Sequence, residues 1–401
     1  MSNKKVNTFP IFLAFLCMGF GDVVGPMVSL AKDTFELTNF LATLLPFSGF
    51  LMFGILSIPM GIYQDRKGKK KVLLIGLLIA FIGLLIPILS GMYGPVVESG
   101  TVDLQSKFYV ILGSILLLGA GATVLQVSGN PIMRDISLPG RYSSNLSLGQ
   151  SIKAIGSSLG FLLPPFAAMA GMDWTLLFPI YAVLILITFG WTSTLKVEEV
   201  KHEDESPASF KSCISLLKNK YILMMVLAIF VYVGAEVSMS SGIPILLKEE
   251  FGIEGFSLWL SWALFFLPIL IGRFLGAAIL TKIKPIKFLF VTVILSILGV
   301  LLLLFGNTII AYVGIIMIGL GFANIFPLVF SITVDKFPER ANELSGLMVT
   351  AIVGGAFIPP LMGLVADSTS ILLGFLVPLG CLIYIFFTAL VASKNYNNKI
   401  L

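Results

Sequence analysis

Long apolar runs dominate the pattern of this chain, and short polar segments separate them. We expect twelve membrane spans, at 9–31, 39–63, 72–92, 107–132, 142–170, 173–195, 221–247, 256–280, 286–306, 308–334, 341–366 and 371–393. About 20 apolar helical residues cross the roughly 30 Å hydrocarbon core of a bilayer. A helix satisfies its own backbone hydrogen bonds in lipid, and the alternating pattern of a membrane β-barrel is absent. The pattern therefore predicts an all-α membrane protein with twelve transmembrane helices.

Composition supports a chain embedded in lipid and excludes several classes of function. Hydrophobic residues make up 57% of the chain and charged residues 12%, whereas soluble domains carry about 25% charged residues. The three cysteines lie far apart and the single histidine, His202, lies in a polar segment, so we expect neither a metal site nor a cofactor. The sequence contains no G-x-x-x-x-G-K-[ST] loop for ATP. These features favour a transporter driven by an ion or substrate gradient over an enzyme or an ATP-driven motor.

The distribution of lysine and arginine predicts the orientation. If both termini are cytoplasmic, 21 of the 26 basic residues lie on the cytoplasmic side, three lie outside and two lie within spans. The net charge of +5 therefore reflects membrane topology and does not indicate a nucleic-acid partner. The longest polar segment, 196–220, separates six spans from six. We accordingly predict an N-terminal bundle at 1–195, a cytoplasmic linker at 196–220 and a C-terminal bundle at 221–401.

The two halves of the chain repeat some of their motifs at an offset of about 200 residues. Gly119-x-Gly121 in the fourth span recurs as Gly319-x-Gly321 in the tenth. Internal duplication is typical of transporter folds, which place the substrate site at the interface of the repeats, near the middle of the membrane. The repeat predicts two six-helix halves related by a pseudo-twofold axis.

The polar turn between the second and third spans contains a specific motif. It reads Gly61-Ile-Tyr-Gln-Asp65-Arg66-Lys-Gly68, followed by two lysines. We expect a tight turn at Gly68, close helix packing at Gly61, and a contact of Asp65 with a helix N-terminus or a basic partner. Gly61, Asp65 and Arg66 are therefore candidate gating residues. The basic run alone would follow from the positive-inside rule, whereas the Asp-Arg-x-Gly spacing resembles the signature of the major facilitator superfamily.

Four ionisable residues lie well inside the predicted spans: Asp22, Lys153, Glu236 and Arg273. Each costs about 2.5–3.5 kcal/mol at a helix centre, so each marks a candidate functional site. Neutralisation predicts the pairs Asp22–Lys153 and Glu236–Arg273. We expect Asp22 to carry a proton, Glu236 to be a second proton site or a sugar ligand, and Arg273 to have a structural or gating role. A permanent Asp22–Lys153 bridge that pins two helices remains the alternative.

Amide side chains near these charges are candidate substrate ligands. Asn145 and Lys153 share a face of the fifth span, Gln150 lies three residues before Lys153, and Gln126 lies on the fourth span. Asn324 in the tenth span is the candidate from the second half. Amides and an ammonium suit sugar hydroxyls and also a carboxylate. The alternative is hydrogen bonding between helices, which contributes only about 0.6 kcal/mol on average.

Three stretches resemble a branch of that superfamily, the fucose–proton symporter family of bacterial sugar permeases. They read Gly19-Phe-Gly-Asp22-Val-Val-Gly-Pro26, Leu125-Gln126-Val-Ser-Gly-Asn130-Pro131 and Asn145-Leu-Ser-Leu-Gly-Gln150-Ser-Ile-Lys153. The resemblance implies a bacterial permease that imports a sugar with protons. We expect a multi-pass protein of the bacterial inner membrane that acts as a monomer. Two positions depart from the family. Gln126 replaces a glutamate implicated in proton coupling, and Lys153 replaces an asparagine implicated in sugar binding.

The expected function is secondary active import of a sugar by alternating access, coupled to protons. The sugar is a hexose, a deoxyhexose or a sugar derivative, and coupling to sodium or to no ion stays open. Lys153 leaves open a symporter for acidic sugars or other organic anions. A drug–proton antiporter with a roomier apolar cavity is a further alternative. A sensor that does not transport is disfavoured, because it has no need for buried charges along a path.

Overall fold

The computed structural model describes residues 9–92, 104–136, 142–195, 209–280, 283–337 and 340–397. Within these ranges the elements are α1 (Phe9–Met18), η1 (Gly19–Gly21), α2 (Val24–Thr34), α3 (Asn39–Ala42), α4 (Leu44–Lys67), α5 (Lys69–Leu89), α6 (Leu104–Asp135), α7 (Tyr142–Met169), η2 (Trp174–Leu176), α8 (Leu177–Thr194), α9 (Phe210–Leu216), α10 (Lys220–Glu249), α11 (Ser257–Ser261), η3 (Trp262–Phe266), α12 (Leu267–Ile279), α13 (Pro285–Phe305), α14 (Thr308–Lys336), α15 (Ala341–Thr350), η5 (Ala351–Val353), α16 (Gly354–Ser368), α17 (Ile371–Gly374) and α18 (Leu376–Asn397).

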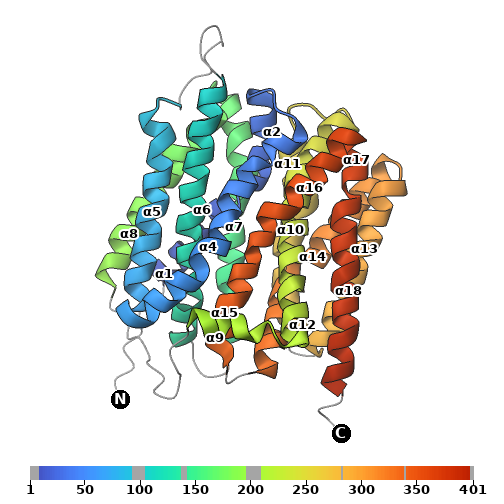
Figure 1. Cartoon of the computed structure of the whole chain (residues 1–401). Coiled ribbons are helices and arrows are strands. Elements are labelled where there is room, and N and C mark those ends of the chain that lie inside the picture. The colour runs from blue at the N-terminus through green and yellow to red at the C-terminus, as the bar shows by residue number, and fades with distance from the viewer. Residues whose placement is uncertain are drawn as a thin grey trace.

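These elements form the predicted set of membrane spans. Among the described residues, twelve helices or joined helices are long and apolar enough to cross a membrane. Nine spans are built mainly on one long helix, and the first, eighth and eleventh are each assembled from shorter helical pieces. Figure 1 shows the N-terminal half, in blue to green, beside the C-terminal half, in yellow to red. The all-α fold class with two six-helix halves is confirmed.

Equivalent glycines pack in equivalent ways in the two halves. A Cβ on Gly119 of α6 would lie 2.1 Å from the backbone oxygen of Gly49 in α4, and one on Gly319 of α14 would lie 2.5 Å from that of Phe265 in η3. The second glycine of each motif packs on the span directly before its own, α5 or α13. Small residues let helix backbones approach in a membrane. The sequence repeat therefore corresponds to a repeat of packing between three consecutive spans.

The first span is interrupted near its middle. α1 and α2 are separated by the 3₁₀ turn η1 at Gly19–Gly21, and Asp22 follows this turn directly. Pro26 lies in the first turn of α2, where its missing N–H leaves no hydrogen bond unmade. Interrupted spans that line an internal site are typical of transporter folds. Asp22 therefore lies where the regular α-helical hydrogen bonding of the first span is interrupted.

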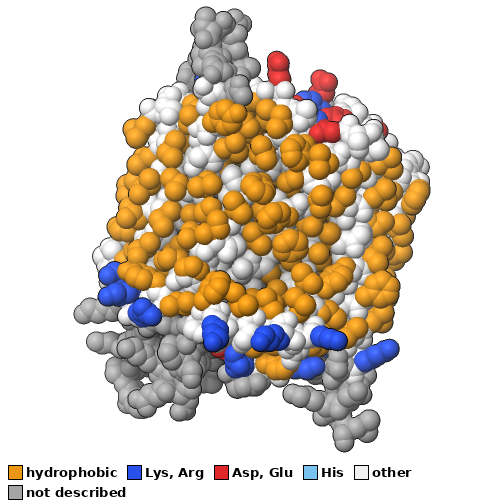
Figure 2. Space-filling model, viewed as in Figure 1, with side chains coloured by type: hydrophobic (Ala, Val, Ile, Leu, Met, Phe, Trp, Pro, Cys, Tyr) orange, Lys and Arg blue, Asp and Glu red, His pale blue; other side chains and the backbone are white. Residues whose placement is uncertain are grey.

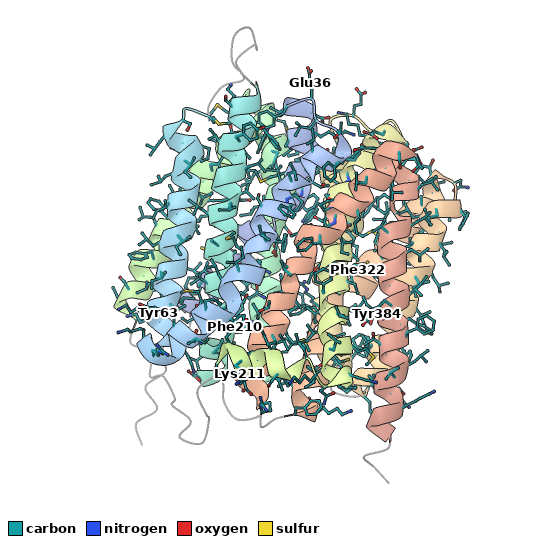
Figure 3. All side chains as sticks on the ribbon, in the orientation of Figure 1. Glu36, Tyr63, Phe210, Lys211, Phe322 and Tyr384 are labelled. Atoms are coloured by element: carbon teal, nitrogen blue, oxygen red, sulfur yellow. The ribbon has the colours of Figure 1, made fainter. Side chains whose placement is uncertain are left out.

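The surface separates into an apolar belt and two polar rims. On the visible face, hydrophobic side chains form the belt, Lys and Arg gather at the lower rim, and Asp and Glu lie at the upper rim (Figure 2). Glu36 lies at the upper rim, whereas Tyr63, Phe210 and Lys211 lie at the lower one (Figure 3). The short helix α9 runs along the lower rim (Figure 1) and belongs to the predicted linker, of which residues 196–208 lie outside the described part.

Candidate functional site

The first predicted ion pair is present. The Lys153 Nζ atom lies 3.0 Å from Oδ2 of Asp22, and the same ammonium donates a hydrogen bond to Oε1 of Gln126 at 3.3 Å. The Ser157 hydroxyl, one turn after Lys153, donates to the same Asp22 oxygen at 3.1 Å. Three spans of the N-terminal half, the first, fourth and fifth, therefore meet at one carboxylate and one ammonium.

Glycines on two facing helices bring this pair together. A Cβ on Gly19 would lie 2.2 Å from the carbonyl oxygen of Lys153, and a Cβ on Gly156 would lie 2.1 Å from that of Leu16. A real Cβ does not fit at such distances, so the first and fifth spans touch backbone to backbone here. Asp22 follows Gly19 closely in the chain. The close approach therefore fixes how far its carboxylate lies from Lys153.

The second predicted ion pair is present in the C-terminal half and reaches the other half. The Arg273 NH2 group lies 3.5 Å from Oε1 of Glu236, and its NH1 group donates to the backbone oxygen of Gln150 at 3.2 Å. Arg273 is on α12, Glu236 on α10 and Gln150 on α7. One guanidinium thus joins an acid of its own half to the fifth span of the opposite half, a contact that charge counting alone did not predict.

Asn324 supports the position of Arg273. Its amide nitrogen donates to the backbone oxygen of Gly272 at 2.8 Å, and a Cβ on Gly276 would lie 2.1 Å from its amide oxygen. Both glycines flank Arg273 on α12, and Asn324 is only 4% exposed. The structure places the Asn324 amide against α12, next to the residues that hold the second pair. Its role as a sugar ligand stays a prediction.

The four charges form one neutral group between the halves. Arg273 contacts the backbone of Gln150, three residues before Lys153 on α7, so the second pair lies beside the first across the interface. Each of the four side chains keeps between 13 and 28% of its surface accessible although it belongs to the middle of a span. Charged side chains without accessible surface would serve only to hold neighbouring helices together. The four side chains are instead only partly buried.

The upper ends of the halves are joined by ion pairs that the sequence analysis did not single out. Lys32 pairs with Glu249, and Lys248 donates to Asp33 at 2.7 Å. Each pair links the end of α2 to the end of α10. All four residues were visible in the sequence as charges at span ends. Their crossed pairing required knowledge of which span ends meet.

A single carboxylate makes a further connection at the same rim. The Asp367 carboxylate accepts hydrogen bonds from the backbone N–H of Asn39 at 2.9 Å, the Asn39 side-chain amide at 2.7 Å and the backbone N–H of Phe40 at 2.9 Å. It thereby caps the start of the second span from the opposite half. The void beneath, lined by residues of both halves such as Val28 and Met362, measures about 10 Å³. We call Asp367, Asn39 and the two crossed ion pairs the outer clamp.

The turn at Gly68 is confirmed, and the basic residues after it hold their own half together. Gly68 has a φ of +91°, and its N–H bonds to the Gln64 carbonyl at 2.8 Å. Lys69 donates to Asp135 of α6 at 2.5 Å, and Lys70 donates to the backbone oxygen of Ser193 at 2.7 Å. The basic run therefore ties the turn to the lower ends of the fourth and sixth spans.

Among the remaining predicted residues, one expectation is corrected. Within the described part of the chain, no atom lies within 4 Å of a Cβ built on Gly61, so the close helix packing expected there is absent. Gly61 is near the lower end of α4, where the span has reached the rim and no neighbouring helix covers this face. Arg66 is exposed. The helices run through Asp65 and Asn145, but both side chains lie outside the described part of the structure.

A separate groove of about 280 Å³ lies between the fifth and eighth spans. Its lining is aromatic and aliphatic, from Leu162, Phe166, Phe256, Trp259, Trp262 and Ala263. None of the predicted site residues lines it, and it contributes almost no polar surface. The charged group and the apolar groove are therefore distinct features of the interface.

Comparisons with known proteins agree over nearly the whole chain. The sequence model of the Major Facilitator Superfamily matches residues 11–360. The chain is 29% identical to a glucose/galactose transporter of Brucella abortus, with 96% of this chain and 93% of that protein covered. It is 27% identical to a putative glucose/galactose transporter of Helicobacter pylori, with 96% of each covered.

Two comparisons concern a fucose–proton symporter. Identity to the L-fucose-proton symporter of Escherichia coli is 23%, over 96% of this chain and 92% of that protein. The crystal structure of FucP in the outward conformation matches with a TM-score of 0.70 at 20% identity, over 95% of this chain and 98% of that chain. This structural likeness concerns the fold.

Proposed function

We propose that this chain, which belongs to the major facilitator superfamily, imports a sugar or sugar derivative together with protons by alternating access. The observation that carries the proposal is the neutral group of two ion pairs, one from each half, at the interface of the halves. A transporter needs a site that both halves share and that can change its charge. The names of the glucose/galactose and fucose relatives support a sugar as the substrate.

The side chains around Lys153 are the proposed substrate ligands of the N-terminal half. Gln126 already contacts the ammonium, and Gln150 lies on the segment that Arg273 contacts. Asn145, on the same helix, is included on the sequence argument alone. Amides both donate and accept, so they match hydroxyl groups. Glu236 and Asn324 are the proposed ligands from the other half.

Asp22 is the proposed proton carrier, with Glu236 as the second acid. While Asp22 is ionised, its carboxylate is bound by Lys153 and Ser157, both on α7 of the N-terminal half. A proton on Asp22 removes the attraction to Lys153 and frees that ammonium. Protonation thus changes both the charge and the available donors of the site. If the Asp22–Lys153 bridge were permanent, Asp22 would not bind and release a proton during transport.

The proposed orientation places the lower rim in Figure 2 in the cytoplasm of a bacterial cell, because lysine and arginine gather there. The outer clamp then closes the site toward the outside in this structure. Import requires the clamp to open, which we propose occurs by movement of the 1–195 bundle against the 221–401 bundle about the 196–220 linker, within one monomer. Arg273, Arg66, Asp65 and Gly61 are the proposed gating residues.

Uptake by the purified protein in liposomes tests this function. A panel of hexoses, deoxyhexoses, amino sugars and sugar acids is offered while a proton gradient and a sodium gradient are imposed separately. We expect accumulation of at least one sugar above its external concentration when the lumen is alkaline, and none with sodium alone. A protein that accumulates no sugar under either gradient, or that instead expels cationic drugs, contradicts the proposal.

A further inference from the structure

The Lys153 ammonium is only partly satisfied by its neighbours. It carries three N–H donors. Among the described residues these donors meet two acceptors, Asp22 at 3.0 Å and Gln126 at 3.3 Å, which leaves one donor for a further acceptor. The side chain is 13% accessible. A ligand that enters between the halves therefore meets a cation with a free donor.

The balance of charge changes when Asp22 takes up a proton. Lys153 on α7 is paired with Asp22, Ser157 donates to the same carboxylate, and the Glu236–Arg273 pair of α10 and α12 reaches α7 from across the interface. The four charges sum to zero at rest. Protonation leaves an excess of one positive charge, located on Lys153. A neutral sugar offers only dipoles to this ammonium, and an uncompensated charge in a membrane interior is unfavourable.

The other cation, Arg273, keeps its own countercharge. Arg273 uses NH2 for Glu236 and NH1 for the Gln150 carbonyl, and Asn324 holds the helix turn that carries it. Protonation of Asp22 leaves these contacts in place. Lys153 is therefore the group at which a negative charge on the substrate would be compensated.

We infer that the preferred substrate is a sugar acid, whose carboxylate pairs with Lys153 while Asp22 carries the proton. This inference rests on the proposed function and adds the chemical class of the sugar. One carboxylate and one proton enter together, so the loaded site again sums to zero. Transport is then electroneutral, driven by a pH difference and insensitive to membrane potential. The amides of Gln126 and Gln150 are placed to contact the hydroxyl groups.

Matched sugar pairs test the inference with the full-length protein in liposomes. D-glucuronate is compared with D-glucose and D-galacturonate with D-galactose, under a pH gradient and, separately, under a potassium diffusion potential. We expect KM for the acid to be at least tenfold lower than for its neutral partner, and its uptake to be unchanged by the potential. Preference for the neutral sugar, or uptake of the acid that follows the potential, overturns the inference. Accumulation of neutral sugar with protons would still leave the proposed function standing.

Two variants locate the preference at Lys153. We expect Lys153→Asn to reduce the preference for the acid at least tenfold, whereas Lys394→Asn, which removes an exposed lysine at the end of α18, leaves it unchanged. Since Lys153→Asn leaves Asp22 unpaired and can lower expression, Asp22→Asn provides the second measurement. It leaves Lys153 without its countercharge. We expect calorimetry on the purified variant to show at least tenfold tighter glucuronate binding, with little dependence on pH. Unchanged or weaker binding contradicts the inference.

Discussion

At the residue scale, the chemistry depends on how each buried charge is compensated. Asp22 has two partners on one helix, Lys153 at 3.0 Å and Ser157 at 3.1 Å, and both act on the same oxygen. Glu236 has a longer contact of 3.5 Å with Arg273. The Asp22 pair therefore has better hydrogen-bond geometry, while the Glu236 pair is the one that extends to the opposite half. The first pair therefore lies within the N-terminal half, whereas the second pair carries the contact between the halves.

Asp22→Asn is expected to abolish accumulation against a gradient while it retains exchange of substrate across the membrane. The variant keeps the shape of the side chain and cannot release or bind a proton. A pH difference of one unit across the membrane contributes about 1.4 kcal/mol, equal to tenfold accumulation, and this contribution is lost. Uptake and counterflow in liposomes measure the two activities. Glu254→Gln, which neutralises an exposed acid of the outer loop, is the control. Accumulation at the level of the native protein by Asp22→Asn would assign coupling to another residue.

At the element scale, glycine positions decide how closely helices approach, and this sets the geometry of the site. The first and fifth spans touch at Gly19 and Gly156, directly beside the Asp22–Lys153 pair. Further out, a Cβ on Gly25 would lie 2.1 Å from the hydroxyl oxygen of Ser240, so the first and seventh spans also meet closely between the charges and the outer clamp. The same few helical turns therefore determine both how closely the helices pack and how the charges pair.

Gly156→Ala is expected to lower stability and disturb the ion pair. The added methyl group would lie 2.1 Å from the Leu16 carbonyl, so one of the two backbones must move. Overpacking of this kind costs about 1–3 kcal/mol. Gly113→Ala makes the same chemical change in α6 where no atom lies within 4 Å, and it should be neutral. The apparent melting temperature of each purified variant gives the comparison. Equal melting temperatures would show that the first and fifth spans are not in tight contact.

At the scale of the whole molecule, the two halves are held by different kinds of contact at different depths. The outer clamp consists of exposed and half-buried polar contacts, whereas Arg273 links the halves beside the charged group. Exposed polar contacts break at modest cost because water replaces them. The proposed alternating access would separate these contacts without disturbing the helix packing within either half.

Asp367→Asn is expected to shift the protein toward an outward-open state. The substitution removes the charge that accepts three hydrogen bonds from Asn39 and Phe40. Partial exposure limits the effect, so we expect about a tenfold change in the equilibrium, or 1.4 kcal/mol. Spin labels at Glu36→Cys and Glu254→Cys report the separation of the outer ends by pulsed resonance. Ser368→Ala, whose hydroxyl bonds only to its own helix, is the control. A distance distribution identical to that of the native protein would remove Asp367 from the clamp.

Labelling of single cysteines tests the orientation of the whole molecule. A cysteine at Lys211, exposed on α9 at the lower rim, should react with an impermeant reagent only in inverted vesicles. A cysteine at Glu36 should react only in intact cells. The positive-inside rule predicts this result, because the lower rim carries most of the basic residues. The reverse labelling pattern would place the outer clamp on the cytoplasmic side of the membrane.

Hydropathy in the sequence alone determined the twelve spans and the fold class, because each helix must match the bilayer through its own composition. Neutralisation likewise predicted the partners of Asp22 and Glu236, since few other charges lie inside the spans. Only the tertiary structure placed Arg273 against the opposite half, paired the charges of the outer clamp and left Gly61 without close packing. These contacts depend on how separate helices rotate and approach, and that is decided by glycine packing among spans far apart in the chain.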